Sequence, residues 1–273
     1  FAFTVYQKML FGLPFFVGSD FFMWVDEPAL GIAAHFPEDS NYGLINEKDE
    51  PYQLLTEACV RLNPRVGDIH AGRTAELSVR AGKRGEFVVA NTGTVPAAAT
   101  VTLWADGVPR PLSLNLPAGK RQTVAADAAA LRKPGGHYVR CAVEPAGGTL
   151  EMTASDNAAD QVLYTPGVKA PLAAARRIPL VVTNPEADAR GATPLAVPAA
   201  ALAKLDWKAQ AGKVALFDVT AGAAPVPCQL DLLPEGAELA ALVPAIPPYG
   251  VRTLMVCVGA EKAAPDAGPA VTY

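Results

Sequence analysis

The most apolar run of the sequence, Phe15 to Glu27, constrains the fold more than any other stretch. It has a proline on each side and lacks the alternation of apolar and polar residues that a strand with one wet face shows. A run of this length between turn residues fits a strand buried on both faces, as in parallel sheets. Its acids are Asp20 in the middle and Asp26 and Glu27 at the end. We therefore predict a buried parallel strand whose polar groups gather toward its carboxyl end.

Helical patterns lie on both sides of this run. Before it, a helical spacing of apolar residues consists of Val5, Tyr6, Met9 and Leu10. Gly12 can cap that helix. After a long loop, an amphipathic stripe consists of Leu54, Leu55, Ala58, Cys59 and Leu62, and it ends at Asn63-Pro64. The predicted order is helix, buried strand, long loop and amphipathic helix.

Three blocks of this region carry a family resemblance. They are the run from Pro14 to Pro28, then Ser40-Asn41-Tyr42-Gly43-Leu44-Ile45-Asn46, then Asp49-Glu50-Pro51-Tyr52. In this order they resemble the end of a glycoside hydrolase (β/α)8 barrel, in the clan that includes the β-galactosidases and β-agarases. The resemblance covers about 60 residues, whereas a complete barrel needs roughly 250.

The resemblance has consequences for activity. In that clan the acid/base follows the fourth strand and the nucleophile follows the seventh, and both would lie upstream of Phe1. It implies a bacterial glycoside hydrolase in its complete form, with no catalytic residue in this chain and no activity of this chain by itself. The implied partners are a carbohydrate substrate and upstream barrel residues of the same polypeptide. The implied location is extracellular or periplasmic.

Strand parity gives a candidate substrate site. Asp20, Phe22 and Trp24 share one face, and we place it toward the barrel interior because a charge against the helix ring would be costly to desolvate. With Asp26 and Glu27, these are the candidate substrate-binding residues, since aromatic faces suit the apolar faces of sugars and carboxylates accept from hydroxyls. Asp26 is also expected to brace the loop that follows. The alternative is that the aromatics are barrel core and that Asp20 pairs with an upstream cation.

Direct catalysis by Asp26 and Glu27 is disfavoured. Adjacent residues at a strand end point apart, whereas the two carboxylates of a glycosidase face each other across a cleft of roughly 5–10 Å. Beyond them, the loop at 29–50 carries a set of polar or amphipathic residues, namely His35, Glu38, Asp39, Asn41 and Tyr42. Such a loop either shapes the site or is simply solvated.

From residue 75 the apolar pattern changes to period two. The predicted strands are Ala75–Val79, Gly85–Asn91, Ala98–Ala105, Gln122–Ala126, His137–Val143 and Gln161–Tyr164. Short strands separated by turn residues are typical of a β-sandwich. The blocks Val88–Gly93, Val101–Gly107, Leu116–Gly119, Gly136–Val139 and Asp156-Asn157 resemble the Ig-like CARDB domain of bacterial surface proteins. These are mostly turn and core residues, so they argue fold rather than chemistry.

A second all-β pattern begins at Arg176. The predicted strands are Ile178–Val182, Val214–Asp218, Val226–Leu230, Glu238–Val243 and Arg252–Val258. The pieces at 226–230 and 246–250 resemble accessory β-domains attached to large carbohydrate-active enzymes. Proline, alanine and glycine content predicts linkers at 166–175 and 261–273, and residues 66–74 are predicted to link the helix to the first sandwich.

Composition limits the partners. A net charge of −4 over 273 residues gives no electrostatic case for nucleic acid or for an anionic membrane. The apolar run at 15–25 is too short to span a bilayer. No phosphate loop, GxGxxG or GxSxG motif occurs, so we expect no cofactor.

Metal and disulfide signals are weak. His35, His70 and His137 lack metal-ligand spacing, so we expect no metal site. Asp156-Asn157-x-x-Asp160 is either an ordinary turn or a calcium loop. The four cysteines, Cys59, Cys141, Cys228 and Cys257, form no CxxC motif. They are either buried free thiols or include a Cys228–Cys257 pair.

The predicted fold class is mixed: the last β/α unit of a (β/α)8 barrel at 1–65, then two all-β sandwich (Ig-like) domains at 75–165 and 176–260. The predicted function is that of a C-terminal part of a multidomain glycoside hydrolase acting on a poly- or oligosaccharide. The alternative is a carbohydrate-binding or adhesion-type surface protein whose Ig-like domains are the functional part.

Overall fold

The computed structural model describes residues 2–28, 41–220 and 222–259. Its helices are α1 (Ala2–Phe11), α2 (Gln53–Leu62), a 3-10 turn (Asn63–Arg65) and α3 (Val66–His70). α1 and α2 confirm the two helices predicted from apolar spacing, and α2 ends at Leu62 as predicted. α3 corrects the prediction of a linker from residue 66, because the chain resumes a helical turn directly after Asn63-Pro64.

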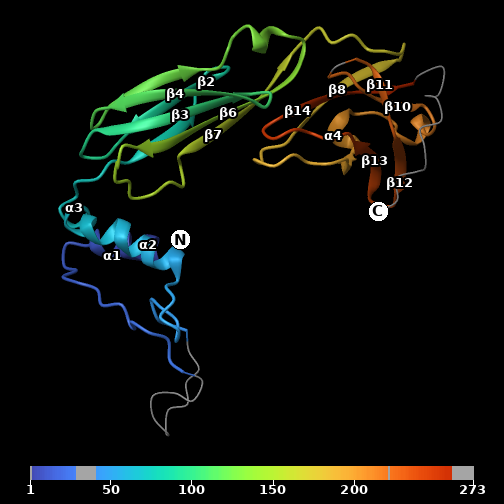
Figure 1. Ribbon diagram of the computed structural model, residues 1–273. Helices are drawn as coiled ribbons and strands as arrows, with labels where there is room; N and C mark the ends of the chain where they lie inside the picture. Colours follow the sequence, from blue (N-terminus) through green and yellow to red (C-terminus); the bar gives the residue numbers. More distant parts are fainter. Residues whose placement is uncertain (1, 29–40, 221, 260–273) are drawn as a thin grey trace.

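A small apolar cluster joins the helices to the first sandwich. Phe3 and Phe11 of α1 pack with Leu62 and Ile69. Leu150 and Met152, which follow the strand that ends at Ala146, complete the cluster. The helices therefore lie together against one end of the β structure, as Figure 1 shows.

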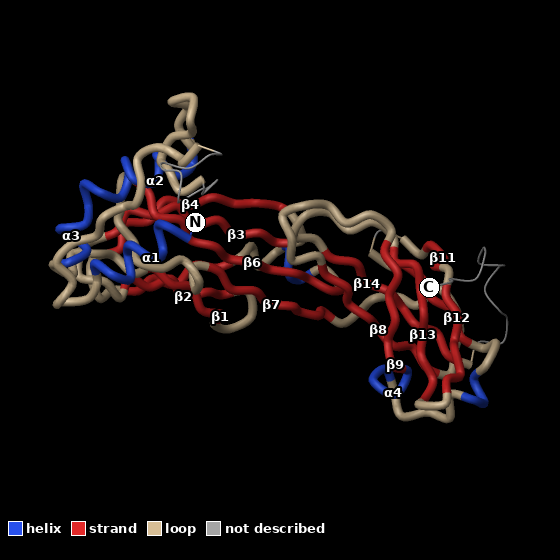
Figure 2. The backbone as a smooth tube through the Cα atoms, turned by 90° about the horizontal axis from the view of Figure 1, so that it is seen from below, coloured by secondary structure: helices blue, strands red, loops and turns tan. Residues whose placement is uncertain are grey.

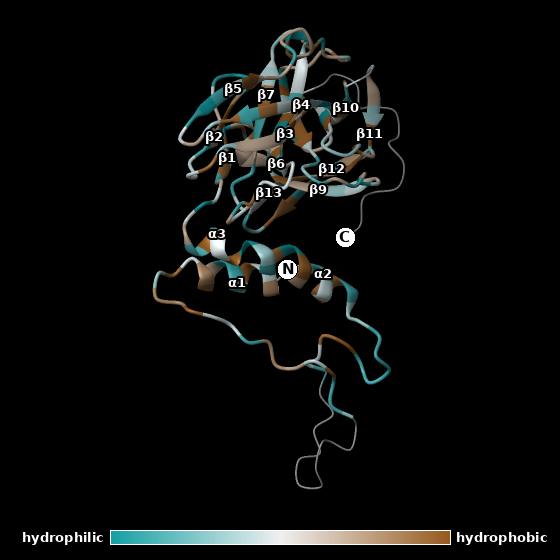
Figure 3. Ribbon diagram, turned by 60° about the vertical axis from the view of Figure 1, so that its left-hand side comes forward, coloured by the Kyte–Doolittle hydropathy of each residue, from teal (hydrophilic) through white to brown (hydrophobic). Residues whose placement is uncertain are grey.

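The buried strand predicted at 15–27 is absent. Residues 15–24 form no strand, and Phe15 and Val17 are largely exposed. Only Val25 enters a β-bridge, parallel with Ile45. The chain here extends away from the sandwiches (Figures 1 and 3). A buried strand needs hydrogen-bonding neighbours along both edges, and no described segment pairs with residues 17–22.

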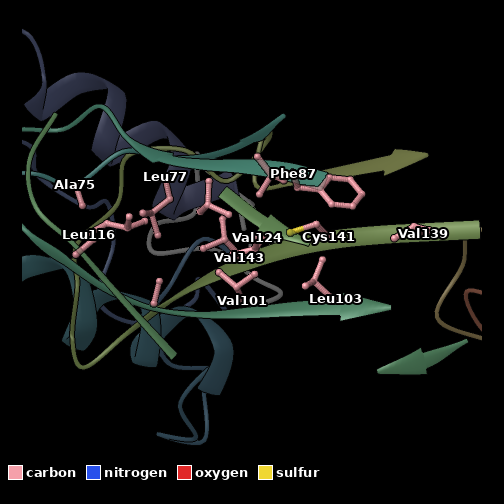
Figure 4. Close-up of a cluster of buried hydrophobic side chains, with 14 of the residues drawn as sticks. Ala75, Leu77, Phe87, Val101, Leu103, Leu116, Val124, Val139, Cys141 and Val143 are labelled. Atoms are coloured by element: carbon pink, nitrogen blue, oxygen red, sulfur yellow. The ribbon is translucent and has the colours of Figure 1, made fainter. Parts of the chain in front are cut away.

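The first sandwich consists of two antiparallel sheets. One has the order β1-β2-β5, with bounds Leu77–Ala81, Glu86–Asn91 and Arg121–Ala125. The other has the order β4-β3-β6-β7, with bounds Val108–Leu116, Ala97–Ala105, Gly135–Ala146 and Ala158–Thr165. Leu77, Phe87 and Val124 of the first sheet meet Val101 and Leu103 of the second in one core (Figure 4). Each strand predicted for this region overlaps an observed one.

β4 is the strand of this sandwich that the sequence did not predict. Pro109 and Pro111 argue against a strand, since proline donates no ladder hydrogen bond. β4 lies at the edge of its sheet and pairs only with β3, so these prolines cost less there.

The second sandwich also consists of two antiparallel sheets. The order β11-β10-β14-β8 has bounds Ala224–Val226, Val214–Asp218, Val251–Val258 and Arg176–Thr183. The order β12-β13-β9 has bounds Cys228–Leu233, Gly236–Val243 and Thr193–Pro198. Leu216 and Leu254 of one sheet pack with Leu239 of the other and with Trp207. Short helical turns are α4 (Ala199–Leu202), Ala130–Arg132 and Lys208–Gln210.

Two strand predictions need correction here. The strand predicted at 226–230 is divided at Pro227 between β11 and β12, which belong to different sheets. Pro227 has no N–H for a continuous ladder, so the chain changes sheets at this residue. β9 was not predicted, and its two prolines lie at positions 194 and 198.

The two sandwiches meet through a close backbone contact. β6 begins beside β14 and β8 of the second sandwich (Figure 2). The Gly136 N–H donates to Thr253 Oγ1 at 2.8 Å, and a Cβ placed on Gly136 would lie 2.6 Å from a Val181 methyl. Beside this contact the ring centroids of Trp104 and Tyr249 lie 4.7 Å apart. Glycine at position 136 therefore sets how closely the sandwiches approach.

The segment at 166–175, predicted as a linker, has no regular structure but is not a free tether. Four of its residues pack on the outer face of the β10–β14 sheet, and they are Val168, Ala170, Leu172 and Ala174. Phe217, Met255 and Cys257 are among the residues beneath them. The connection is therefore fixed to the second sandwich. The predicted linker at 261–273 lies outside the described residues.

Candidate functional site

The five predicted site residues fall into two groups. Phe22 and Trp24 are 73% and 68% exposed, and Asp20 is also exposed. Asp26 and Glu27 are buried. Phe22 and Trp24 therefore present their rings to solvent, and the two acids at the end of the run are covered by the chain.

Asp26 ties the segment to the loop and to the start of α2. Asp26 Oδ1 accepts the Gly43 N–H at 2.7 Å, and Oδ2 accepts the Tyr52 hydroxyl. This hydrogen bond raises the pKa of Tyr52. Backbone bonds reinforce the tie, since the Asp26 N–H donates to Ile45 O at 3.0 Å. The brace that the sequence predicts for Asp26 is present.

Gly43 is required at this tie for steric reasons. A Cβ at position 43 would lie 2.5 Å from the Asp26 backbone nitrogen and 2.5 Å from the Ile45 oxygen. These are backbone atoms that cannot turn aside as a flexible side chain can. The Gly43 N–H can therefore reach the Asp26 carboxylate only because residue 43 has no side chain.

A pocket of 340 Å³ lies between α1, the end of α2 and the segment that contains Asp20. Ser19, Asp20 and Phe21 line one side, and Gln7 of α1 and Asn63 after α2 line the other. Gln7 Nε2 donates to Ser19 Oγ at 2.9 Å, which holds the segment to α1. The pocket offers amide, hydroxyl and carboxylate groups beside the Phe3 and Phe21 rings, whose centroids are 5.9 Å apart. Polar groups beside aromatic edges suit a small polyhydroxylated ligand.

A second cluster of ionisable groups lies where α1 meets the first sandwich. Lys8 Nζ donates to the Glu151 carbonyl. The Glu151 carboxylate accepts the Leu77 N–H and Asn157 Nδ2, each at 2.9 Å. Burial lowers the pKa of Lys8, against the opposing effect of Glu151 and Glu76. Burial also raises the pKa of Glu151, against the effect of its two hydrogen bonds.

Sequence reasoning did not find this cluster. Lys8 and Glu151 are 143 positions apart, and neither stands in a motif. Cavities of 380 and 650 Å³ flank Lys8, and both are lined by Thr4 as well. Each ionisable group already bonds to the backbone or to Asn157. Lys8 and Glu151 therefore hold α1 against the sandwich, and we call this pair the Lys8–Glu151 clamp.

The clamp makes stability depend on pH. The folded state raises the pKa of Glu151 and Glu76 above the ordinary 4.5, so it binds more protons than the unfolded chain just above that pH. Their contribution to the free energy of unfolding therefore falls as pH rises above 4.5. Lys8 has a lowered pKa, so its unfavourable contribution is relieved as pH rises toward 10.5.

Glu151→Gln is expected to be less stable than the native chain but to show a flatter decline above pH 4.5. It removes the titrating group and also its repulsion of Glu76. Urea denaturation between pH 4 and 8 measures this slope. Glu144→Gln, at an exposed position of β6, is the control and should leave the slope unchanged. Parallel pH profiles for native and Glu151→Gln chains would contradict the assignment.

The other residues considered as ligands have structural partners. Asp160 pairs with Arg140 at 2.9 Å, and the Asp156 carbonyl accepts the Val79 N–H. His137 is buried between Asp106 and the Lys133 carbonyl, each at 2.8 Å. Within the described ranges no group of three His, Cys, Asp or Glu side chains could hold a metal ion. His35, Glu38 and Asp39 lie outside those ranges.

All four cysteines are free thiols. Burial raises the pKa of Cys141 to about 12 and also raises the pKa of Cys257. Cys228 packs against the core of the second sandwich, whereas Cys257 packs against the segment at 166–175. The two side chains thus belong to different apolar clusters and do not pair.

None of the described helices combines the length and apolarity that crossing a membrane requires.

Among solved structures this chain has distant likenesses. No family model matches the sequence, and a search of curated proteins found no match. A solved CARDB domain from Pyrococcus furiosus, in complex with di-metal ions, shares 15% identity over 34% of this chain and 90% of that chain, with a TM-score of 0.29. Red sea bream transglutaminase shares 15% identity over 87% of this chain and 37% of that chain, with a TM-score of 0.22. Both scores are low, so the β-sandwich fold rests on the sheets and cores of this chain itself.

Proposed function

We propose that residues 1–65 are the last β/α unit of a (β/α)8-barrel glycoside hydrolase that acts on a poly- or oligosaccharide. Asp20, Phe22, Trp24, Asp26 and Glu27 belong to its sugar site. The catalytic carboxylates come from the rest of the barrel. The first sandwich is an accessory domain of the CARDB type, and the second is a further accessory domain. The protein works outside the cytoplasm, where polysaccharides are met.

The Asp26 tie carries this proposal. The three blocks that resemble the hydrolase clan are separate in sequence, yet one carboxylate contacts the second block at Gly43 and the third at Tyr52. A parallel bridge between Val25 and Ile45 adds to this. A shared hydrogen-bond centre explains why those three blocks occur together and in order.

The exposed aromatics are the second support. Phe15, Phe22 and Trp24 are each at least 68% exposed, and Val17 between them is fully exposed. Several large apolar side chains exposed within one short segment are typical of an interaction site. Neighbouring barrel strands would pair along both edges of the run, and barrel helices would cover one face, which leaves Trp24, near its end, toward the sugar.

Trp24→Ala in the complete polypeptide is expected to lower kcat/KM for an aryl β-galactoside or an agarose oligosaccharide about tenfold. Loss of an aromatic platform costs roughly 1–2 kcal/mol, and each 1.4 kcal/mol is a factor of about ten. Tyr6→Ala, an exposed aromatic of α1, is the matched control and should leave kcat/KM unchanged.

Thermal midpoints of both variants separate binding from folding. A lowered midpoint with unchanged kcat/KM for Trp24→Ala would make Trp24 a core residue of the barrel and refute the site. A complete polypeptide that hydrolyses neither substrate would count against the hydrolase itself.

A further inference from the structure

A groove of 560 Å³ crosses the outer face of the β1-β2-β5 sheet, on the side away from the core. Its floor is made of small side chains, namely Ser78, Val88 and Ala90. Its walls carry three cations, Arg80, Lys120 and Arg121, and all three are exposed.

Strand register explains why these residues gather. Ala90 of β2 lies between Ser78 of β1 and Arg121 of β5 in one cross-strand row. Val88 lies between Arg80 and Thr123 in the next row. Alternate residues along each strand face outward, so small residues on the central strand and long cations on the outer strands leave a trough.

Lys120 is held at the end of this trough by the backbone. Its N–H donates to Pro117 O at 3.1 Å, and its carbonyl accepts the Asn91 N–H at 2.9 Å. Gly119 before it has a φ of +68°, which an L side chain rarely adopts. The turn therefore fixes where the Lys120 side chain starts, close to Arg121.

The cations of the groove have no charge partner among residues 2–28, 41–220 and 222–259. Among the described residues, none of the three makes an ion pair, and no carboxylate lines the groove. This local positive charge stands against a net charge of −4 for the whole chain. Arginine in particular suits bidentate contacts to carboxylate and sulfate-like groups.

An unpartnered hydroxyl in the floor points to the same kind of ligand. Ser78 is only 8% exposed and lines the groove. Within the part of the chain that the structure describes, its side chain makes no hydrogen bond. The Ser78 hydroxyl oxygen still reaches solvent from the floor, so it is open to a hydrogen bond with a ligand oxygen.

The shape and lining of the groove distinguish between anionic ligands. Arg80 and Arg121 stand on outer strands separated by two strand spacings, roughly 10 Å, so they suit successive anionic groups of a polymer. Among the described residues, the lining has no aromatic side chain on which a base could stack. These lining residues also form no apolar pocket for a peptide anchor, because the largest apolar one is Val88. Hydroxyls from Ser78 and Thr92 suit a ligand rich in hydroxyl groups.

We propose that this groove binds an acidic polysaccharide, whose sugar units carry carboxylate or sulfate groups. The site lies on the first sandwich and does not depend on the proposed hydrolase activity. The cations contact the anionic groups, and Ser78 and Thr92 contact sugar oxygens. Binding weakens with salt, because each contact is partly exposed.

The test measures binding of the full chain to polygalacturonate by isothermal titration calorimetry at low salt. Arg80→Gln/Arg121→Gln is expected to weaken binding at least tenfold. The matched control, Arg110→Gln/Arg176→Gln, removes two exposed arginines that lie outside the groove, and it should change binding less than twofold. Thermal melts verify that each variant is folded, which the exposed positions favour.

Polyglutamate, single-stranded oligonucleotide and dextran complete the experiment. Weaker binding of all three than of polygalacturonate supports a glycan with acidic groups. Equal or tighter binding of polyglutamate or of the oligonucleotide would overturn the polysaccharide as ligand. Equal loss of affinity in the control variant, or no binding of polygalacturonate at millimolar concentration, would overturn the groove as a site.

Discussion

Asn91→Ala is expected to lower the free energy of unfolding by about 3 kcal/mol, since it leaves several buried backbone groups without partners. Asn91 is fully buried at the end of β2. Its Oδ1 accepts the N–H groups of Glu76 and Gly93, and its Nδ2 donates to the carbonyls of Val95 and Leu116. Leu116 belongs to the opposite sheet, so one side chain joins both layers of the first sandwich.

Urea denaturation measures this effect, with Asn115→Ala as the control. Asn115 is an exposed residue of β4, and its replacement should change stability by less than about 0.5 kcal/mol. Asn184 makes an equivalent set of bonds in the second sandwich, to Asp188, Ile246, Pro247 and Glu186. Asn184→Ala should therefore cost about as much as Asn91→Ala. A loss as small as that of Asn115→Ala would show that water replaces these bonds.

Gly136→Ala is expected to cost about 2 kcal/mol and to separate the two sandwiches. The new methyl group would lie 2.6 Å from Val181, a stiff β-branched side chain, so the backbone has to move. Movement would also break the bond from the Gly136 N–H to Thr253. Small-angle X-ray scattering should show a larger radius of gyration, and urea denaturation should show lower stability.

A second substitution tests the cause. Val181→Ala removes the methyl groups that the added methyl at position 136 would strike, so Gly136→Ala/Val181→Ala should recover much of the compact shape. Gly67→Ala is the control, because a Cβ there meets nothing within 4 Å and α3 favours alanine over glycine. An unchanged radius of gyration in Gly136→Ala would mean that the contact with Val181 does not hold the sandwiches together.

The sandwich strands could be predicted because their cause is local. Outward and inward residues alternate, and glycine or proline turns separate the runs, so eleven predicted ranges overlap observed strands. β4 escaped prediction because Pro109 and Pro111 are tolerated only at a sheet edge. Edge position depends on the order of strands in the sheet, which a local pattern does not contain.

The buried strand predicted at 15–27 was wrong because its cause is not local. Its composition indicates burial, but burial requires neighbours, and a sequence pattern does not state which segment supplies them. The brace at Asp26 was predictable in role, whereas Gly43 and Tyr52 as its partners depend on how the loop folds back. The groove and the Lys8–Glu151 clamp need strand register and long-range contacts, so no stretch of sequence showed either of them.

The glycine-lined contact between the sandwiches bears on how genes for such proteins recombine. Domains that are exchanged freely between proteins are joined by exposed polar linkers. Each such domain exposes no new apolar surface when it is separated from its neighbour. Here, a first sandwich cut out alone would uncover Trp104 and the buried end of β6, and a second sandwich alone would uncover Val181 and Thr253. Natural exchange, or deliberate fusion to another enzyme, would therefore have to carry residues 75–259 as one cassette.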